Sequence, residues 1–442
     1  MAPTEHPFHR RPHRTLLALG LPVLGSLVAE PLTGLVDTAF VARLGTAPLA
    51  ALGVGTIVLS ASLWIFNFLG VGTQTAVAQA LGRGEREAAA STTAHALALA
   101  IACGVGVAVL GWFGAVPVSR LMGAEGAITD LAAAYVRIRV LGAPAVLVTV
   151  AAFGALRGRE DMTTPLWVAV GVNVLNAVLD GPLVFGWGPA PELGVEGAAW
   201  ASTVAQWLGA GWAVRAALVR LGRPGALAWA EVGSLVRVGG ALFVRTGLLT
   251  LFLLLATRAA TQAGAEAGAA HQAIRQVWAF TALFLDAFAV TGQSLVAGFV
   301  GGGTLVAARR AARVVLGWSA GVGLALALVL LAATPIVGAL LVPEAARPVF
   351  RTAWLASLVF LPVNGLTFGT DGVHWGTGDF RYLAVAVAAA TGLGAAGLAL
   401  VRPEAPDALA LIWWVTGGWI VVRALFGLVR IWPGVGRAPL AG

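Results

Sequence analysis

The chain has 442 residues, of which 59% are apolar and 11% are charged. A soluble chain carries about 25% charged residues, so a string of soluble domains is excluded, and the apolar residues suffice for about twelve membrane helices. All 28 basic residues are arginine and exceed the acidic residues by 8, but they lie between apolar segments instead of clustering, so no nucleic acid partner is expected. The expected fold class is an all-α polytopic membrane protein that sits in a lipid bilayer.

Twelve apolar runs follow one another along the chain, and each is interpreted as a transmembrane helix. They lie near residues 15–41, 50–80, 90–116, 131–156, 164–186, 195–219, 235–262, 269–299, 312–341, 350–372, 382–401 and 408–430. The first run is of spanning length and lacks a convincing cleavage site, so an uncleaved first helix is expected.

The arginines between these runs predict the orientation in the membrane. With the N-terminal tail inside the cell, eighteen arginines, Arg423 among them, fall on the inside and seven, Arg139 among them, fall outside. Arg245, Arg258 and Arg275 lie within or at the edges of apolar runs. Because short cytoplasmic loops carry an excess of basic residues, we expect a multi-pass protein of the cell (inner) membrane with both termini cytoplasmic.

The two halves of the chain resemble each other. Shifting residues 45–89 by 219 positions pairs glycines with glycines and pairs Gln74 with Gln293. Further on, the loop that contains Asp161 resembles the loop that contains Asp379. A repeat of half the chain length therefore indicates two similar bundles.

Each half would contain six spans, so both halves would enter the membrane in the same sense. We expect two pseudo-symmetric six-helix bundles, an N-lobe of residues 1–222 with helices 1–6 and a C-lobe of residues 223–442 with helices 7–12. The stretch 220–231 contains two glycines and a proline and is the expected linker.

Four aspartates, Asp37, Asp180, Asp286 and Asp371, fall within the predicted spans. An ionised carboxylate at the bilayer centre costs about 2.5–3.5 kcal/mol on insertion scales, so acids at this depth are functional candidates. Asp286 follows Arg275 by eleven residues on nearly the same helix face, and a structural ion pair is an equal alternative. Asp371 lies near a cytoplasmic helix end and could simply be solvated there.

The fifth span carries a polar stripe on an otherwise apolar helix. Asn173, Asn176 and Asp180 are spaced at i, i+3 and i+7, so they share one face. Asparagines in membranes also join helices by hydrogen bonds worth about 0.6 kcal/mol, which is the structural alternative. The acid at the end of the stripe favours a functional site.

Sequence motifs of enzymes are absent or have a simpler interpretation. Residues 376–379 (GTGD) resemble the motif of intramembrane aspartyl proteases, but Asp379 falls in a predicted loop and has a loop counterpart in Asp161. No zinc-peptidase, α/β-hydrolase or P-loop signature occurs. We therefore expect that the chain is not an enzyme and has no cofactor.

Segments along most of the chain resemble the multidrug and toxic compound extrusion (MATE) family, in its DinF-type branch. The first of them is residues 31–45 (PLTGLVDTAFVARLG). The others are 79–84 (QALGRG), 156–161 (LRGRED), 173–180, 194–201 (GVEGAAWA), 269–272 (AAHQ), 371–372 and 376–381. The resemblance implies a twelve-helix antiporter that exports amphipathic, often cationic compounds by alternating access in exchange for protons or sodium.

The resemblance also implies roles for individual residues. A coupling and substrate-binding network is matched by Asp37, Asn176 and Asp180, with Thr203 as the nearest match to a hydroxyl on the sixth helix. A proline that bends in some members matches Pro22, the expected hinge. Another branch places an acid on the seventh helix, whereas residues 234–262 contain none, which leaves Asp286 as the C-lobe candidate.

The proton is the favoured coupling ion, because a low-polarity setting and mutual repulsion favour one protonated carboxyl in the Asp37 and Asp180 pair. The alternative is sodium, for which Asp37, Asn176, Asp180 and Thr203 would supply oxygen ligands. A lipid-linked oligosaccharide flippase of the same superfamily is a second alternative, and a non-transporting membrane scaffold is a third. We expect a monomer whose partners are amphipathic or cationic small molecules and the lipid bilayer.

Overall fold

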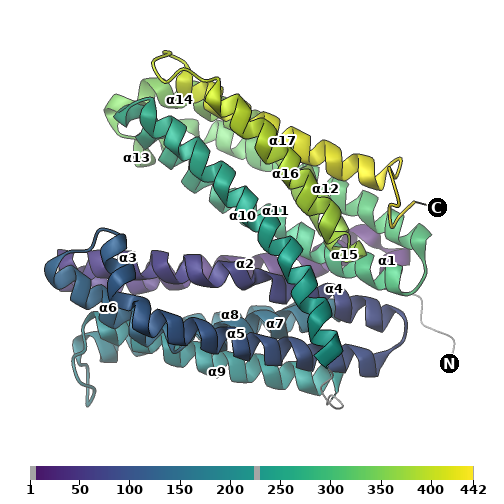
Figure 1. Cartoon of the computed structure of the whole chain (residues 1–442), viewed down its shortest axis with the longest axis horizontal. Coiled ribbons are helices and arrows are strands. Elements are labelled where there is room, and N and C mark those ends of the chain that lie inside the picture. The colour runs from purple at the N-terminus through teal and green to yellow at the C-terminus, as the bar shows by residue number, and fades with distance from the viewer. Residues whose placement is uncertain (1–5, 223–228, 442) are drawn as a thin grey trace. The chain divides into compact units, whose positions relative to one another are not determined.

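The computed structural model describes residues 6–222 and 229–441, apart from the side chains of Glu30 and of most residues from 229 to 237. These residues are almost entirely helical, and no strand occurs among them (Figure 1). The helices of the first half are α1 (Pro7–Arg10), α2 (Pro12–Val41), α3 (Thr46–Trp64), α4 (Phe68–Gly82), α5 (Arg86–Leu121), α6 (Gly126–Val140), α7 (Ala143–Gly158), α8 (Thr163–Phe185) and α9 (Val195–Leu221). Those of the second half are α10 (Trp229–Gln262), α11 (Ala265–Gly301), α12 (Leu305–Ala332), α13 (Thr334–Leu341), α14 (Arg347–Val359), α15 (Leu361–Thr377), α16 (Phe380–Ala399) and α17 (Ala408–Ile431).

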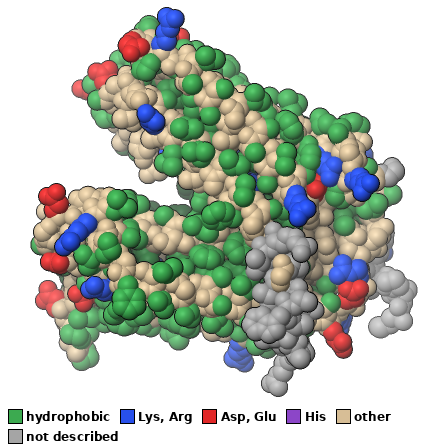
Figure 2. Space-filling model, in the orientation of Figure 1, with side chains coloured by type: hydrophobic (Ala, Val, Ile, Leu, Met, Phe, Trp, Pro, Cys, Tyr) green, Lys and Arg blue, Asp and Glu red, His purple; other side chains and the backbone are tan. Residues whose placement is uncertain are grey.

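The lengths and hydropathy of these helices fit a bundle that crosses a membrane twelve times. Among the described residues, nine helical stretches are long and apolar enough to span, and eleven if each of two bent pairs is one span. The remaining long helix is α9, with 27 residues. Hydrophobic side chains cover the helices along their length, whereas charged side chains gather towards helix ends (Figure 2).

The two bent pairs have a common cause. The pair α6 and α7 bends by 45°, and the pair α14 and α15 bends by 44°. Each second helix has a proline in its first turn, Pro144 in α7 and Pro362 in α15. Because proline has no N–H to donate to the preceding turn, each predicted span becomes two short helices.

The described chain forms two compact units, but their boundaries differ from the expected ones. The N-lobe consists of Leu21–Gly239, and the C-lobe combines the chain up to Gly20 with the chain from Gly240 onward. Both boundaries lie inside helices, the first in α2 and the second in α10. The compact units therefore divide within α2 and α10 instead of at residue 222, and the first long helix of each half contributes residues to both lobes. Residues 223–228 of the expected linker lie outside the described residues.

Close helix packing repeats from one half to the other. A Cβ on Gly158 of α7 would lie 2.7 Å from the carbonyl oxygen of Gln74 in α4. In the second half, a Cβ on Gly376 of α15 would lie 2.8 Å from the carbonyl oxygen of Gln293 in α11. Glycine is needed at both positions for the backbones to approach so closely. The predicted internal repeat thus appears in equivalent helix contacts.

The repeated loops have equivalent ion pairs. Asp161 lies 3.6 Å from Nε of Arg220 at the end of α9, and Asp379 lies 2.7 Å from Nε of Arg430 near the end of α17. Each pair ties the loop after the fourth span of one half to that half's last helix. Asp379 therefore has a structural partner, which agrees with the interpretation of GTGD as part of the repeat.

Candidate functional site

A buried acid cluster lies in the N-lobe and consists of Asp37, Asn176, Asp180 and Ser202. Helices α2, α8 and α9 bring these residues together, and each is at most 5% exposed. Oγ of Ser202 donates a hydrogen bond to Oδ2 of Asp37 over 2.9 Å. Nδ2 of Asn176 lies 3.2 Å from Oγ of Ser202 and donates to it. The chain Asn176–Ser202–Asp37 therefore links three helices inside one lobe.

Several oxygens of the acid cluster are buried without a hydrogen-bond partner among the described residues. They are Oδ1 of Asp37, Oδ1 of Asn176 and both carboxyl oxygens of Asp180. Asp37 and Asp180 are also close enough for their charges to interact. Two neighbouring carboxylates with three unpartnered oxygens between them are unfavourable in a buried site, so the cluster is suited to hold a proton or a small cation.

The hydroxyl group that reaches Asp37 comes from Ser202, one residue before the expected Thr203. Oγ1 of Thr203 instead donates to the carbonyl oxygen of Ile138 in α6 over 3.3 Å. Neighbouring residues of a helix point about 100° apart, so a shift of one residue changes the side that a hydroxyl faces. The expected hydroxyl is thus present on the expected helix but in a different register.

The polar stripe on α8 serves two different contacts. Asn176 and Asp180 belong to the acid cluster, whereas Asn173 lies one turn earlier. Oδ1 of Asn173 accepts a hydrogen bond of 2.6 Å from Thr33 of α2, and its Nδ2 donates to the carbonyl oxygen of Ala169. Asn173 therefore joins α8 to α2 near the cluster.

Sequence reasoning missed Arg139, which it had assigned to an outside loop. Arg139 lies at the end of α6, at the bend of the fourth span, and its Nη1 donates to Oε1 of Gln206 in α9 over 2.9 Å. Its positive charge acts on Asp37. The signal was available, because Arg139 stands between Ile138 and Val140 inside a run that had been interpreted as a span.

Two other expected site residues lie outside the acid cluster. Pro22 is inside α2, two residues after Gly20, where the helix passes from the C-lobe to the N-lobe. Asp286 is on α11 in the C-lobe and is partly buried. Arg275, eleven residues earlier on α11, donates a hydrogen bond from Nη1 to Oγ1 of Thr257 over 2.7 Å.

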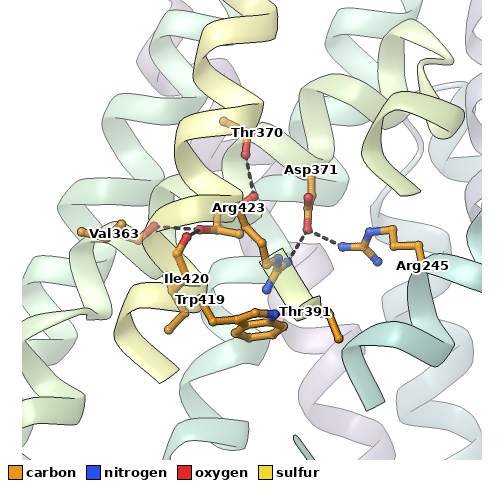
Figure 3. Close-up of polar contacts among 9 residues, drawn as sticks. Arg245, Val363, Thr370, Asp371, Thr391, Trp419, Ile420 and Arg423 are labelled. Atoms are coloured by element: carbon orange, nitrogen blue, oxygen red, sulfur yellow. Dashed lines mark hydrogen bonds and ion pairs between the residues drawn. The ribbon is translucent and has the colours of Figure 1, made fainter. Parts of the chain in front are cut away.

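A second buried cluster lies in the C-lobe, and we call Arg245, Asp371 and Arg423 the arginine cluster (Figure 3). Oδ2 of Asp371 accepts hydrogen bonds from Nη2 of Arg245 and from Nη2 of Arg423, the latter over 3.0 Å. The residues come from α10, α15 and α17 and are 8%, 3% and 7% exposed. The interpretation of Asp371 as a solvated group is wrong, because its side chain is buried. Arg423, which was counted among the arginines between spans, is also buried and lies within α17.

Comparison with known proteins agrees with the repeated architecture. The family model MatE matches residues 22–181 and again residues 242–400. The two matches begin close to the lobe boundaries inside α2 and α10.

Several curated proteins are similar over most of their length. Protein DETOXIFICATION 44, chloroplastic, from Arabidopsis thaliana is 31% identical and the match covers 84% of this chain and 73% of that protein. Protein DETOXIFICATION 45, chloroplastic, from the same plant is 30% identical over 94% of this chain and 76% of its own. A probable multidrug resistance protein NorM from Deinococcus radiodurans is 32% identical over 58% of each chain.

Solved structures share the fold. A crystal structure of MATE in the bent conformation has a TM-score of 0.86 at 21% identity, with 95% of each chain covered. An outward-facing multidrug resistance MATE transporter of the MOP superfamily has a TM-score of 0.85 at 21% identity, with 96% of this chain and 97% of that chain covered. At this identity the likeness confirms the all-helical transporter fold.

Proposed function

The chain belongs to the multidrug and toxic compound extrusion family, and from this premise we propose that it exports amphipathic, often cationic compounds in exchange for protons. Membership makes it a multi-pass membrane transporter and supports transport instead of catalysis.

The observation that carries the proposal is the group of unpartnered oxygens in the acid cluster. Asp37 and Asp180 present three carboxyl oxygens without donors in a buried setting among the described residues. One proton shared by the pair removes their repulsion, and a cationic compound nearby would do the same. Because either positive species satisfies the cluster, binding of one disfavours binding of the other, which is what an antiporter requires.

Arg139 and Ser202 would give the two aspartates different tasks. Ser202 donates to Asp37, and the charge of Arg139 offsets a negative charge there. Asp180 has no hydrogen-bond donor among the described residues. We propose that Asp180 is the carboxyl that gains and loses the proton, while Asp37 positions it through their electrostatic contact.

The proton gradient would supply sufficient free energy for export. One proton that moves down 100 mV and one pH unit releases about 2.3 and 1.4 kcal/mol, respectively. The sum supports a several-hundredfold gradient of a neutral exported compound, at about 1.4 kcal/mol per tenfold. Neither ATP nor a cofactor is needed in this scheme.

Pro22 is the proposed hinge of the transport cycle. Proline removes the hydrogen bond to the preceding turn of α2, and the helix changes lobes two residues earlier. Bending at this position would alter the path of the N-lobe part of α2, which includes Asp37. We further propose a monomer in the cell (inner) membrane with both termini cytoplasmic, since the arginine bias remains without Arg139 and Arg423.

The test is transport by the purified chain in proteoliposomes. Export of a fluorescent cation such as ethidium is measured with a pH gradient in sodium-free buffer, and then with a sodium gradient at fixed pH. We expect the pH gradient to drive transport. Transport that needs sodium and ignores the pH gradient would assign the same oxygens to sodium, and transport driven by neither gradient would refute the proposed antiport.

A further inference from the structure

We propose that the arginine cluster of the C-lobe binds one carboxylate group of the compounds that the protein exports. The inference rests on the proposed function for the movement of the bound compound. Binding itself needs only the C-lobe residues Arg245, Asp371 and Arg423. The exported class would then include amphipathic carboxylates and zwitterions besides cations.

The charge count of the cluster leaves one positive charge uncompensated. Arg245 and Arg423 are both more than nine-tenths buried, and both contact the same oxygen, Oδ2 of Asp371. One carboxylate cannot neutralise two guanidinium groups. A buried excess charge is costly in a membrane, and charged residues inside spans are normally paired with an opposite charge. The excess matches the charge of a single carboxylate.

The guanidinium groups retain donors for such a ligand. Nε of Arg245 and Nε of Arg423 are buried without a hydrogen-bond partner among the described residues. Arginine has five N–H donors in a planar fork, which suits a carboxylate that accepts two parallel hydrogen bonds. A ligand carboxylate would therefore satisfy donors that Asp371 leaves unused.

Aromatic rings hold both forks in place. Cζ of Arg245 lies 5.2 Å from the ring centroid of Trp375. Cζ of Arg423 lies 4.6 Å from the ring centroid of Trp419, and Figure 3 shows these two side chains beside each other. Trp419 is fixed in turn, because Phe252 stacks on it at 4.4 Å. Such contacts orient a guanidinium before a ligand arrives and reduce the entropy lost on binding.

Asn364 supplies a further polar group on the same helix face. It precedes Asp371 by seven residues on α15, which is two helical turns. Asn364 is fully buried, and neither its Nδ2 nor its Oδ1 has a hydrogen-bond partner among the described residues. Two helical turns correspond to about 11 Å, so a polar substituent of a ligand held at the arginine cluster would have to extend this far along α15 to reach the amide.

The net charge also distinguishes the carboxylate from other anions. A phosphate monoester carries a charge of about −1.5 to −2 at pH 7 and would leave the site negative. The pyrophosphate of a lipid-linked oligosaccharide would need several uncompensated arginines, and this cluster has one. A purely structural triad is the competing interpretation, and it predicts no preference among ligands.

The experiment measures equilibrium binding of radiolabelled ligands to the purified full-length protein in detergent. Benzoate, its neutral analogue benzamide and phenyl phosphate share one ring and differ in charge. We expect benzoate to bind at least tenfold more tightly than benzamide, and more tightly than phenyl phosphate. Equal affinities for benzoate and benzamide would overturn the proposal, and preferred binding of phenyl phosphate would overturn the carboxylate assignment.

Variants locate the binding to the cluster. Arg423→Gln and Arg245→Gln should remove the preference for benzoate, and Arg423→Lys should retain part of it because the charge remains without the fork. Asp371→Asn removes a competing anion, so benzoate affinity should rise several-fold. A preference that survives both Gln variants, or a loss of benzoate binding in Asp371→Asn, would contradict the assignment. If the Gln variants do not fold, the Lys and Asn variants decide.

Two controls separate this proposal from the proposed function. Arg347→Gln alters an exposed C-lobe arginine and should bind benzoate as the unaltered protein does. Asp180→Asn should lose proton-driven export and keep benzoate binding. Export without benzoate preference would refute only the carboxylate site, whereas benzoate preference without proton-driven export would refute only the antiport scheme.

Discussion

The acid cluster of the N-lobe and the arginine cluster of the C-lobe carry opposite charges, and their carboxylates differ in the hydrogen-bond donors that reach them. In the acid cluster, Asp180 has no hydrogen-bond donor among the described residues. In the arginine cluster, the carboxylate of Asp371 accepts hydrogen bonds from two arginines. The first is therefore suited to positive species and the second to negative ones, although the two halves share a common framework.

The charges are not copied from one half to the other. The 219-residue shift that pairs Gln74 with Gln293 places Ala256 opposite Asp37. What the halves share are glycines at close helix contacts, prolines at bends and one loop ion pair each. The helical framework is therefore repeated in the two halves, whereas the buried charged residues differ between them.

The largest expected effect comes from removing the titratable charge of the acid cluster. Asp180→Asn and Asp37→Asn keep side-chain volume and relieve an insertion cost, so both variants should insert normally and lose proton-driven export at least tenfold. Export in proteoliposomes at matched protein amounts measures this. Asp286→Asn should be milder. If Asp286→Asn alone abolishes export, coupling belongs to the C-lobe and the contrast between the clusters fails.

A smaller but still large effect is expected for Arg139. Arg139→Gln removes the positive charge that acts on Asp37 and weakens the contact with Gln206, so export should fall several-fold and its pH dependence should move. Arg137→Gln is the matched control two residues away, where Nε contacts only a backbone carbonyl, that of Trp112, at 3.4 Å among the hydrogen bonds described. Equal effects of the two variants would remove Arg139 from the coupling site.

The shared framework predicts equal losses of stability in both lobes. Gly158→Ala and Gly376→Ala would each force a Cβ against a backbone carbonyl oxygen, at a cost of about 1–3 kcal/mol. The melting temperature in detergent should fall in both variants. Gly106→Ala of α5 meets nothing within 4 Å and should leave it unchanged. A loss confined to one lobe would show that the repeat does not extend to packing.

The smallest expected effect is the difference in export between variants of two neighbouring hydroxyl groups. Ser202→Ala removes a hydrogen bond to Asp37, and bonds to charged groups contribute about 1.5–3 kcal/mol. Thr203→Val removes a bond to a backbone carbonyl oxygen. Ser202→Ala should therefore weaken export more than Thr203→Val. The reverse order would restore Thr203 as the hydroxyl of the coupling site.

Much of the fold followed from the sequence because hydrophobic runs report burial in lipid directly. The polar stripe on α8 also identified Asn176 and Asp180, since an acid inside an apolar run is costly to insert and is seldom kept without a function. Ser202 was missed because hydropathy does not define the rotation of α9 to within one residue. Arg423 was missed because it was counted with the cytoplasmic arginines, although it lies inside the predicted span 408–430.

The division of α2 and α10 between lobes had no local signal. Both helices read as continuous apolar runs, and the polar, glycine-containing stretch near residue 222 was a more visible boundary. Lobe membership is decided by contacts between residues far apart in the chain, such as the ring contact of Phe8 with Phe299. Periodicity and composition do not contain that information.

This division also constrains how the chain can be assembled. Residues before Gly20 leave the ribosome first, yet their lobe is completed by residues from Gly240 onward. At about 5–20 residues per second, the N-terminal segment waits at least some ten seconds for its packing partners. If the coding sequence is split between codons 222 and 229, two protein fragments are made, and neither fragment contains all residues of a lobe. We expect each fragment to be degraded when made alone and to accumulate when both are made in one cell, and stable accumulation of a single fragment would disprove this dependence.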